Sequence, residues 1–146
     1  MTAVIARAEI VREALSWCGT PYRHQASVRG IGCDCLGLVR GVWRALYGRE
    51  AELPPGYSPD WAETAGDEPL LEAARRHLVA IAIADARAGD VLVFRYRPAV
   101  SAKHVAILAT PDTMIHAADG APVAEVALTP WWRRRIAAAF AFPGAQ

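Results

Sequence analysis

The chain has 146 residues, of which 53% are hydrophobic and 21% are charged, and its formal net charge is +1. This length suits one domain over residues 1–146, with a core large enough to fold without disulfide or metal cross-links, and the composition excludes a disordered chain. The near-neutral charge argues against a nucleic-acid-binding protein, which would carry a strong basic excess.

Neither a leader sequence nor a membrane span is expected. Charged residues interrupt the apolar N-terminal segment between Arg7 and Glu13, so no secretory signal forms. No run reaches the roughly 18 apolar residues of a membrane span. The chain has three cysteines, and only one residue separates Cys33 from Cys35, which disfavours a disulfide framework. We therefore expect reduced thiols and synthesis in the cytoplasm.

Helices are predicted in the first half of the chain, because apolar residues repeat there at helical spacing. Gly19-Thr20-Pro21-Tyr22 ends the first helix, and Asp34 stands where its side chain can cap the second. The proline-rich run from Leu53 to Pro59 cannot lie inside a helix and is predicted to form an irregular surface loop. The three helices are predicted over residues 4–17, 35–47 and 67–79.

Strands are predicted in the second half, where short apolar runs alternate with turn residues such as Pro111-Asp112 and Asp119-Gly120. Helices first and strands second predict an α+β fold rather than alternating βαβ units. The five strands are predicted over residues 91–94, 104–108, 114–117, 123–128 and 136–142.

Cys35 carries the clearest chemical signal, because it stands where a glycine-rich loop turns into the predicted second helix. The macrodipole and the free backbone N–H groups of a helix N-terminus favour the thiolate, which is the nucleophilic form of cysteine. A cysteine followed at long range by histidine is typical of a cysteine hydrolase. His104 and His116 lie in predicted strands downstream and are the candidate partners.

A tight turn at residues 110–113 would pair the two strands antiparallel and make residues near 104 and 116 neighbours. His104 would then take the thiol proton, hold a thiolate–imidazolium pair and protonate the leaving amine, while His116 would orient His104. The alternative interpretation is a zinc site whose ligands are Cys33, Cys35, His104 and His116. The Cys-x-Cys spacing fits zinc poorly. No metal or other cofactor is expected.

Five motifs occur in a characteristic order. They are Gly19-Thr20-Pro21-Tyr22, Asp34-Cys35-x-Gly37, Gly89 to Phe94, His104 to Ile107 and Ile115 to Ala117. Together they resemble the NlpC-type (NlpC/P60) family of cell-wall cysteine peptidases, over about residues 7–143. The chain is most similar to the branch found in phage tail modules and gene transfer agents, because it has Tyr-Arg-His-Gln after Gly-Thr-Pro, then Asp-Cys-Leu-Gly-Leu and a closing Phe-x-Phe-Pro.

The resemblance implies a papain-like fold, in which the helix that bears the nucleophile packs on a C-terminal antiparallel sheet of about five strands. It implies Cys35 as nucleophile, His104 as base and His116 as the third member of the site. Tyr22 is implied to lie close to the thiol and to help position the substrate or the oxyanion. Asp34 is implied to lie beside the nucleophile and to meet the free amine of the substrate.

The implied activity is cleavage of peptidoglycan stem peptides, typically between D-glutamate and diaminopimelate. The implied setting is a phage-like particle that acts on the cell wall and periplasm, with tail or baseplate proteins as partners and neither nucleic acid nor membrane. Two departures limit the resemblance: Leu36 stands where many members have Ser, and Gln25-Ala26 replaces a Gly-Gly pair. An adaptor tail protein of weak activity, and an amidase or acyltransferase with the same cysteine and histidine, therefore stay open as alternatives.

Overall fold

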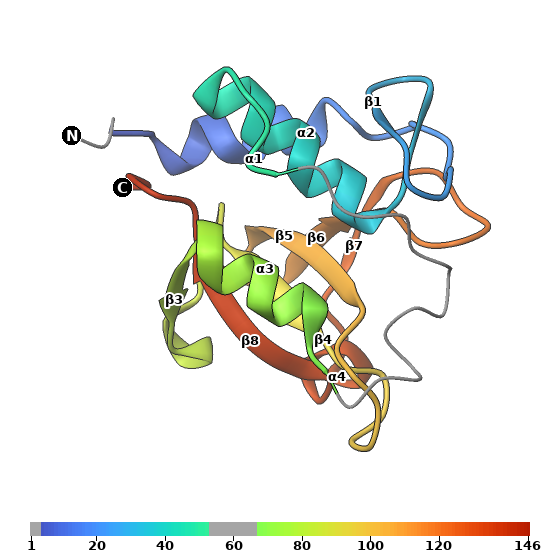
Figure 1. The fold of residues 1–146 in the computed structure, drawn as a ribbon, viewed down its shortest axis with the longest axis vertical. Coiled ribbons are helices and arrows are strands. Elements are labelled where there is room, and N and C mark those ends of the chain that lie inside the picture. The colour runs from blue at the N-terminus through green and yellow to red at the C-terminus, as the bar shows by residue number, and fades with distance from the viewer. Residues whose placement is uncertain (1–3, 53–66) are drawn as a thin grey trace.

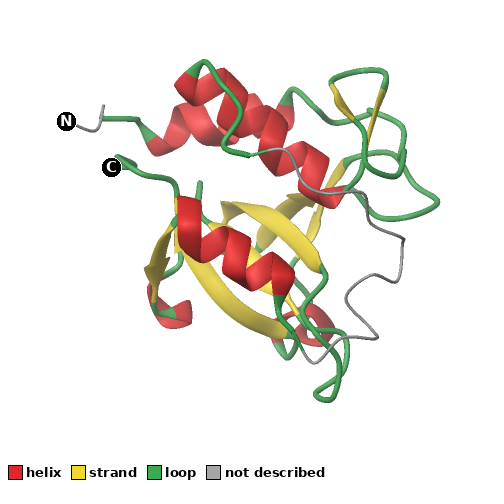
Figure 2. Ribbon diagram, in the orientation of Figure 1, coloured by secondary structure: helices red, strands yellow, loops and turns green. Residues whose placement is uncertain are grey.

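The computed structural model describes residues 4–52 and 67–146, and the loop predicted over residues 53–59 lies outside the described residues. A helical layer packs on a β-sheet (Figures 1 and 2). Helices α1 (Arg7–Leu15), α2 (Cys35–Tyr47) and α3 (Pro69–His77) cover one face of this sheet. None of the described helices is long and apolar enough to cross a membrane.

Six antiparallel strands form the sheet, in the order β3-β8-β4-β5-β6-β7. The last strand of the chain, β8, lies inside the sheet between β3 and β4. The strands are β3 (Val79–Ile81), β4 (Val91–Phe94), β5 (His104–Thr110), β6 (Thr113–His116), β7 (Ala124–Ala127) and β8 (Ile136–Ala141). The smaller elements are β1 (Ser27–Val28), β2 (Gly32–Cys33), the 3-10 helix η1 (Ile83–Asp85) and α4 (Pro130–Arg133).

Both faces of the sheet are covered, which explains why β4 is a continuous apolar run rather than an alternating one. Val91 and Val93 belong to the core between the sheet and the helical layer. Leu92 and Phe94 point to the opposite face, where Trp132 of α4 packs edge-on against Phe94 with their ring centroids 5.0 Å apart. The molecule therefore has two apolar cores, one on each side of the sheet.

The predicted α+β class, with helices packed on an antiparallel sheet, is confirmed, although the sheet has six strands instead of five. The prediction of a third helix over residues 67–79 was wrong at its C-terminal end. That helix stops at His77, because Leu78 adopts an extended conformation and Val79–Ile81 pairs with β8 as strand β3. The first helix is also shorter than residues 4–17, since Ile5 forms a β-bridge with Ala145 before α1 begins.

Helix α2 begins at Cys35 because Asp34 caps it, as the sequence predicts. The Oδ1 atom of Asp34 accepts a hydrogen bond from the backbone N–H of Gly37 at 2.7 Å. At the other end Gly48 adopts a φ of 77°, which suits glycine and ends the helix. The cap and the end of the helix together define where the chain presents Cys35.

Close backbone contacts then hold α2 in position. A β-carbon on Gly37 would overlap the carbonyl oxygen of Ala26, and one on Gly41 would overlap the indole ring of Trp17. The absence of a side chain at these two positions lets the preceding loop and the segment after α1 lie directly against α2. The start of α2 is thereby fixed relative to the rest of the helical layer.

Arg7 of α1 connects the helical layer to the sheet. Its Nη1 donates to Oδ1 of Asp90 at 2.5 Å and to the carbonyl oxygen of Ala88 at 3.2 Å. The Asp90 side chain is fully buried, and its Oδ2 accepts from the backbone N–H of Arg87 at 2.9 Å. Both carboxylate oxygens of this buried residue are therefore satisfied.

The two ends of the described chain pair with each other. The backbone N–H of Ile5 donates to the carbonyl oxygen of Gly144 at 2.9 Å, and the N–H of Gln146 donates to the carbonyl oxygen of Ile5 at 2.9 Å. Figure 1 places this pairing on the side of the molecule opposite the start of α2.

Candidate active site

Cys35 lies half-buried at the first turn of α2, where the helix meets the beginning of β5. Its thiol donates a weak hydrogen bond to the carbonyl oxygen of Lys103, with 3.9 Å between Sγ and that oxygen. The backbone N–H of Val105 also faces the sulfur. The thiol of Cys35 thus contacts the peptide groups on both sides of His104.

His104 begins β5 and His116 ends β6, so the hairpin brings them together as predicted. The Nε2 atom of His104 lies 2.9 Å from Nδ1 of His116, within hydrogen-bonding distance. Both side chains are buried, with only 4% and 6% of their respective surfaces exposed. A hydrogen bond between two buried imidazoles fixes the orientation of both rings.

Burial decides the protonation of these groups. Burial, together with the negative charge of Asp34, raises the pKa of the Cys35 thiol to about 12. The backbone N–H of Val105 in β5 lowers the pKa, as do those of Leu36 and Cys35 at the start of α2, but burial outweighs them. The sequence-based expectation of a favoured thiolate is therefore not met by the resting protein, which carries a neutral thiol.

The two imidazoles are neutral for the same reason. Burial, with a smaller contribution from the charge that His116 would carry, lowers the pKa of His104 to about 3. Burial also lowers the pKa of His116. A neutral imidazole can accept a proton, so His104 has the protonation state that a general base requires.

Tyr22 lies near the thiol, as the family resemblance implies. A β-bridge between Tyr22 and Cys33 brings it to the loop that precedes α2. Burial and the charge that Cys35 would carry raise the pKa of its hydroxyl to about 12. The hydroxyl therefore remains protonated and can donate a hydrogen bond near the sulfur.

Asp34 has a structural role in addition to any contact with substrate. It is 3% exposed, its Oδ1 caps α2 through Gly37, and its Oδ2 accepts from the backbone N–H of Gln25 at 2.7 Å. Gln25 itself has a φ of 64°, in the left-handed region that only a few non-glycine residues adopt. The carboxylate of Asp34 thus holds the loop in front of Cys35 in place.

Aromatic residues that the sequence-based prediction missed enclose the histidine pair. Trp132 stacks on His104 with ring centroids 5.3 Å apart and meets His116 edge-on at 5.4 Å. Tyr96 also stacks on His104, with ring centroids 5.9 Å apart. The pKa of the Tyr96 hydroxyl is raised by burial and by the charge that Cys35 would carry. The Thr129-Pro130 helix-start signature could have located α4, but nothing in the sequence placed that helix beside His104.

The other two cysteines stand apart from this arrangement. All three cysteines are free thiols; Cys33 is buried and Cys18 is exposed just after α1. Within residues 4–52 and 67–146, no group of three or more His, Cys, Asp or Glu side chains could hold a metal ion.

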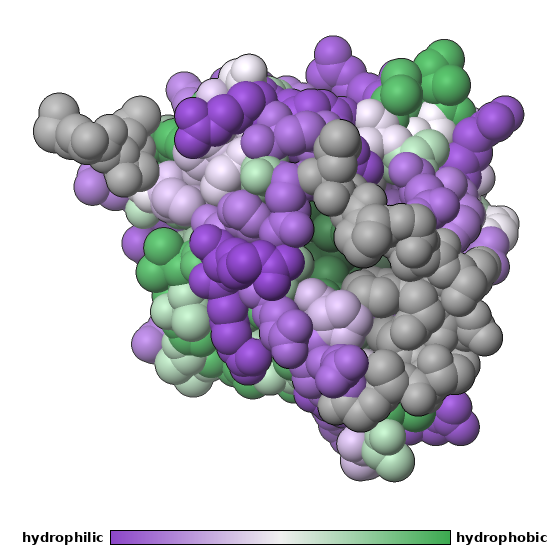
Figure 3. All heavy atoms as spheres, viewed as in Figure 1, coloured by the Kyte–Doolittle hydropathy of each residue, from purple (hydrophilic) through white to green (hydrophobic). Residues whose placement is uncertain are grey.

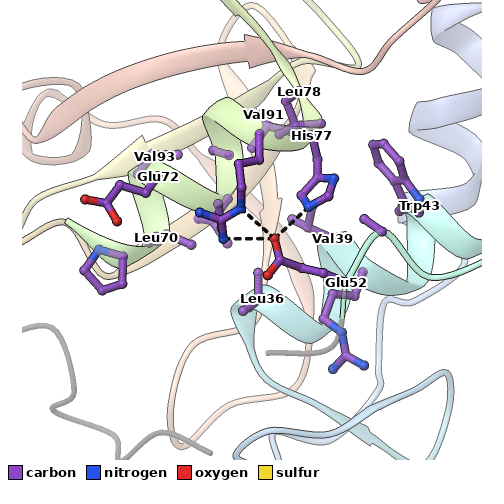
Figure 4. Close-up of a pocket in the computed structure, with 17 residues that line it drawn as sticks. Leu36, Val39, Trp43, Glu52, Leu70, Glu72, His77, Leu78, Val91 and Val93 are labelled. Atoms are coloured by element: carbon purple, nitrogen blue, oxygen red, sulfur yellow. Dashed lines mark hydrogen bonds and ion pairs between the residues drawn. The ribbon is translucent and has the colours of Figure 1, made fainter. Parts of the chain in front are cut away.

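A separate apolar cavity of about 230 Å³ lies between α2 and α3 (Figures 3 and 4). Leu36 and Val105 contribute to its wall, and each of them follows a predicted catalytic residue in the sequence. Glu52 also lines the cavity and forms ion pairs with Arg76 at 2.9 Å and His77 at 2.6 Å (Figure 4). None of the five predicted site residues lines this cavity, so it adjoins the site without containing it.

Comparison with known families decides the relationship of the chain. The model of the NlpC/P60 family matches residues 19–140. The chain belongs to the NlpC/P60 family. Membership confirms the predicted enzyme class, the cysteine peptidases of this peptidoglycan hydrolase family.

Solved structures share the fold of this NlpC/P60 chain. The NlpC/p60 domain of the peptidoglycan hydrolase SagA is 24% identical with a TM-score of 0.70, and the match covers 94% of this chain and 100% of that chain. An NlpC/P60 family protein from Bacillus cereus is 21% identical with a TM-score of 0.68 over 97% of this chain and 41% of that chain. The peptidoglycan hydrolase RipB from Mycobacterium tuberculosis is 18% identical with a TM-score of 0.59, and the match covers 92% of this chain and 63% of that chain.

These likenesses confirm the papain-like NlpC/P60 fold, with the helix that bears Cys35 packed on an antiparallel sheet. Among curated proteins, none matches the NlpC/P60 chain with significant similarity. The chain spans all of the SagA domain but less than half of the Bacillus protein.

Proposed function

We propose that the chain is a cysteine peptidase that hydrolyses peptidoglycan stem peptides, between D-glutamate and diaminopimelate. The observation that carries this proposal is the thiol of Cys35 beside the peptide groups that flank His104, while His104 is hydrogen-bonded to His116. Family membership supplies the class of substrate.

The proposed reaction starts from the neutral thiol and the neutral imidazole. The reaction uses the tautomer of His104 that is protonated at Nε2, which lies within hydrogen-bonding distance of Nδ1 of His116, so that Nδ1 of His104 accepts the thiol proton. The sulfur then attacks the carbonyl carbon, and the imidazolium gives its proton to the nitrogen of the leaving amine as the C–N bond breaks. Water, activated by the same imidazole, hydrolyses the thioester and restores the thiol.

The remaining predicted residues act on the substrate rather than on the proton. The N–H group of Cys35 points out of the start of α2 and helps to bind the oxyanion, with the protonated hydroxyl of Tyr22 close by. Asp34 is positioned beside the nucleophile, where its negative charge attracts the free amine of the stem peptide. The neutral Leu36 offers an apolar contact where other members have a hydroxyl.

Digestion of purified peptidoglycan, followed by mass spectrometry of the fragments, tests the proposal. Cys35→Ala and His104→Ala are each expected to lower the rate of fragment release by at least about a thousandfold, because each removes a group that takes part in bond cleavage. Cys18→Ala is the matched control, because it also replaces a cysteine by alanine, but at an exposed position outside the site. This variant is expected to retain full activity.

The masses of the fragments identify the bond. New amino groups on diaminopimelate support the proposed bond, whereas cleavage of the amide bond that joins the stem peptide to the glycan identifies an amidase. Full activity of Cys35→Ala would overturn the proposal, and an unmodified wall with a folded wild-type protein would favour the adaptor interpretation.

We also propose that the protein acts as part of a phage-like particle. The support is the set of sequence motifs typical of the phage-tail and gene-transfer-agent branch, namely Tyr22 to Gln25, Asp34 to Leu38 and Phe140 to Pro143. The partners would be tail or baseplate proteins. Detection of the chain in purified particles by mass spectrometry tests this setting, and its absence from particles whose other tail proteins are detected would contradict it.

A further inference from the structure

Arg135, which follows α4, is held in place without a carboxylate. Its guanidinium carbon lies 3.7 Å from the centroid of the Trp131 ring. Its Nη1 donates to the carbonyl oxygen of Trp131 at 2.9 Å, and its Nε donates to the carbonyl oxygen of Tyr96 at 3.3 Å. Among the described residues, no carboxylate pairs with Arg135, and its Nη2 has no hydrogen-bond partner.

Several other arginines form ion pairs with carboxylates instead. Arg7 pairs with Asp90, and Arg95 pairs with Glu68. Glu50 binds two further arginines, and Asp112 binds one. Arg135 instead combines a fixed orientation with an unused donor. A guanidinium that is already fixed loses little side-chain entropy when a ligand carboxylate binds, because its planar fork is pre-organised.

The position of Arg135 connects it to the candidate active site by two routes. Tyr96, whose carbonyl it contacts, stacks on His104 with ring centroids 5.9 Å apart. Trp131, whose ring it covers, packs edge-on against Trp132 at 4.9 Å, and Trp132 stacks on His104 at 5.3 Å. Trp131 is 43% exposed, so this surface is open to a ligand.

We propose that Arg135 and Trp131 form a substrate subsite, the α4 subsite, which binds a carboxylate of the peptide stem. This inference rests on the proposed function. A glutamate linked through its side chain keeps a free α-carboxylate, and diaminopimelate carries carboxylates of its own. The guanidinium of Arg135 pairs with one of these carboxylates through Nη2, and the exposed part of the Trp131 ring packs against the adjacent aliphatic chain.

The test compares a synthetic stem peptide with versions in which either the glutamate α-carboxylate or the diaminopimelate carboxylates are amidated. Amidation of the recognised carboxylate is expected to raise KM for the wild-type protein about tenfold and to leave kcat within about twofold, since a charge-assisted hydrogen bond is lost away from the reacting atoms. The group whose amidation has this effect identifies the source of the carboxylate.

Arg135→Gln is expected to raise KM for the unmodified peptide by the same factor and to abolish its difference from the amidated peptide. Arg134→Gln is the matched control, because Arg134 is exposed, lies next in the chain and has no carboxylate partner within the described part of the chain. It is expected to leave both KM values within about twofold. The comparison of peptides on the wild-type protein holds even if Arg135→Gln lowers stability.

The outcomes separate this inference from the proposed function. Cleavage without any effect of amidation, or equal effects of the two arginine substitutions, overturns the α4 subsite and leaves the peptidase standing. If the wild-type protein cleaves nothing, titration of the peptides into Cys35→Ala decides: binding that depends on the carboxylate and on Arg135 supports the subsite, and binding that is absent or insensitive overturns it.

Discussion

At Cys35 two effects act on the same thiol in opposite directions. The helix N-terminus supplies N–H groups that stabilise the thiolate, while the surrounding protein removes the water that would solvate its charge. Burial has the larger effect, so the Cys35 thiol rests in its protonated form, and in the proposed reaction it becomes nucleophilic only when its proton moves to a base. This protonation makes the resting cysteine less sensitive to solvent electrophiles and oxidants than a free thiolate.

The pH dependence of alkylation follows from these shifts. The pKa of Cys35 is raised to about 12, so a rising pH increases the thiolate fraction throughout the range from about pH 7 to pH 10. Because the pKa of His104 is lowered to about 3, this imidazole stays neutral over that range and adds no second step. We expect the rate of modification of Cys35 by iodoacetamide to rise continuously with pH, as followed by mass spectrometry of the labelled peptide.

Cys18 and Cys33 in the same sample serve as internal references for this experiment, because one is exposed and the other is buried. A plateau of Cys35 reactivity below about pH 7 would contradict the prediction, since it would reveal a thiolate–imidazolium pair already formed in the resting protein.

At the scale of elements, glycine residues without a side chain let neighbouring segments pack directly against α2 and hold it in position. An alanine ordinarily stabilises a helix interior by about 1 kcal/mol relative to glycine. At Gly41 the added methyl group would overlap the ring of Trp17, and overpacking of this kind costs about 1–3 kcal/mol. The propensity gain offsets part of this cost, so we expect Gly41→Ala to lower the free energy of unfolding, measured with urea, by up to about 2 kcal/mol.

The control for this substitution removes the indole ring of Trp17. In a Trp17→Leu background, Gly41→Ala is expected to be neutral or stabilising, because the methyl group then has room and the helix propensity gain remains. If Gly41→Ala stabilised the otherwise unchanged protein, the close contact with Trp17 could not be what holds α2 in position.

The elements with strong local signals were predicted from sequence. Helix α2 has an N-cap, a glycine C-cap and a regular apolar face, and it was predicted with its observed bounds. Strand β3 was not, because Val79–Ile81 becomes a strand only by pairing with β8, which lies far away in the sequence. The two-residue strands β1 and β2 pair with each other and are too short to show an alternating pattern, and the single-turn helix α4 is too short to show a helical one.

The candidate site divides in the same way. Cys35, His104 and His116 lie at element ends, so the cap and the hairpin turn were enough to predict that the histidines meet. Trp132 and Tyr96 enclose His104 through the packing of α4 and the segment after β4 on the sheet. The spacing of residues along the chain does not predict this packing. It also does not predict the burial that sets the protonation of the site.

For the molecule as a whole, the site exists only while the helical layer and the sheet are docked. The ion pair between Arg7 and Asp90 joins these layers, and the carboxylate of Asp90 is fully buried. Loss of one member of a buried pair leaves an uncompensated charge and typically costs about 3–5 kcal/mol. We expect Arg7→Met to lower the free energy of unfolding by an amount of this order, measured by chemical denaturation.

Arg12→Met is the matched control, because Arg12 lies on the same helix, is exposed and has no carboxylate partner among the described residues. Its effect is expected to stay within about 0.5 kcal/mol. Asp90→Asn in the Arg7→Met background is expected to recover part of the loss, since it removes the stranded charge. Equal effects of the two arginine substitutions would contradict the role assigned to this pair.

The pairing of Ile5 with Gly144 and Gln146 has a practical consequence. Both ends of the described chain lie at one place, on the side of the molecule opposite the start of α2 (Figure 1). A tether, label or fused protein attached at either end therefore extends away from the candidate active site. The domain can be anchored on that side while the candidate active site remains free to meet the insoluble polymer of the proposed function.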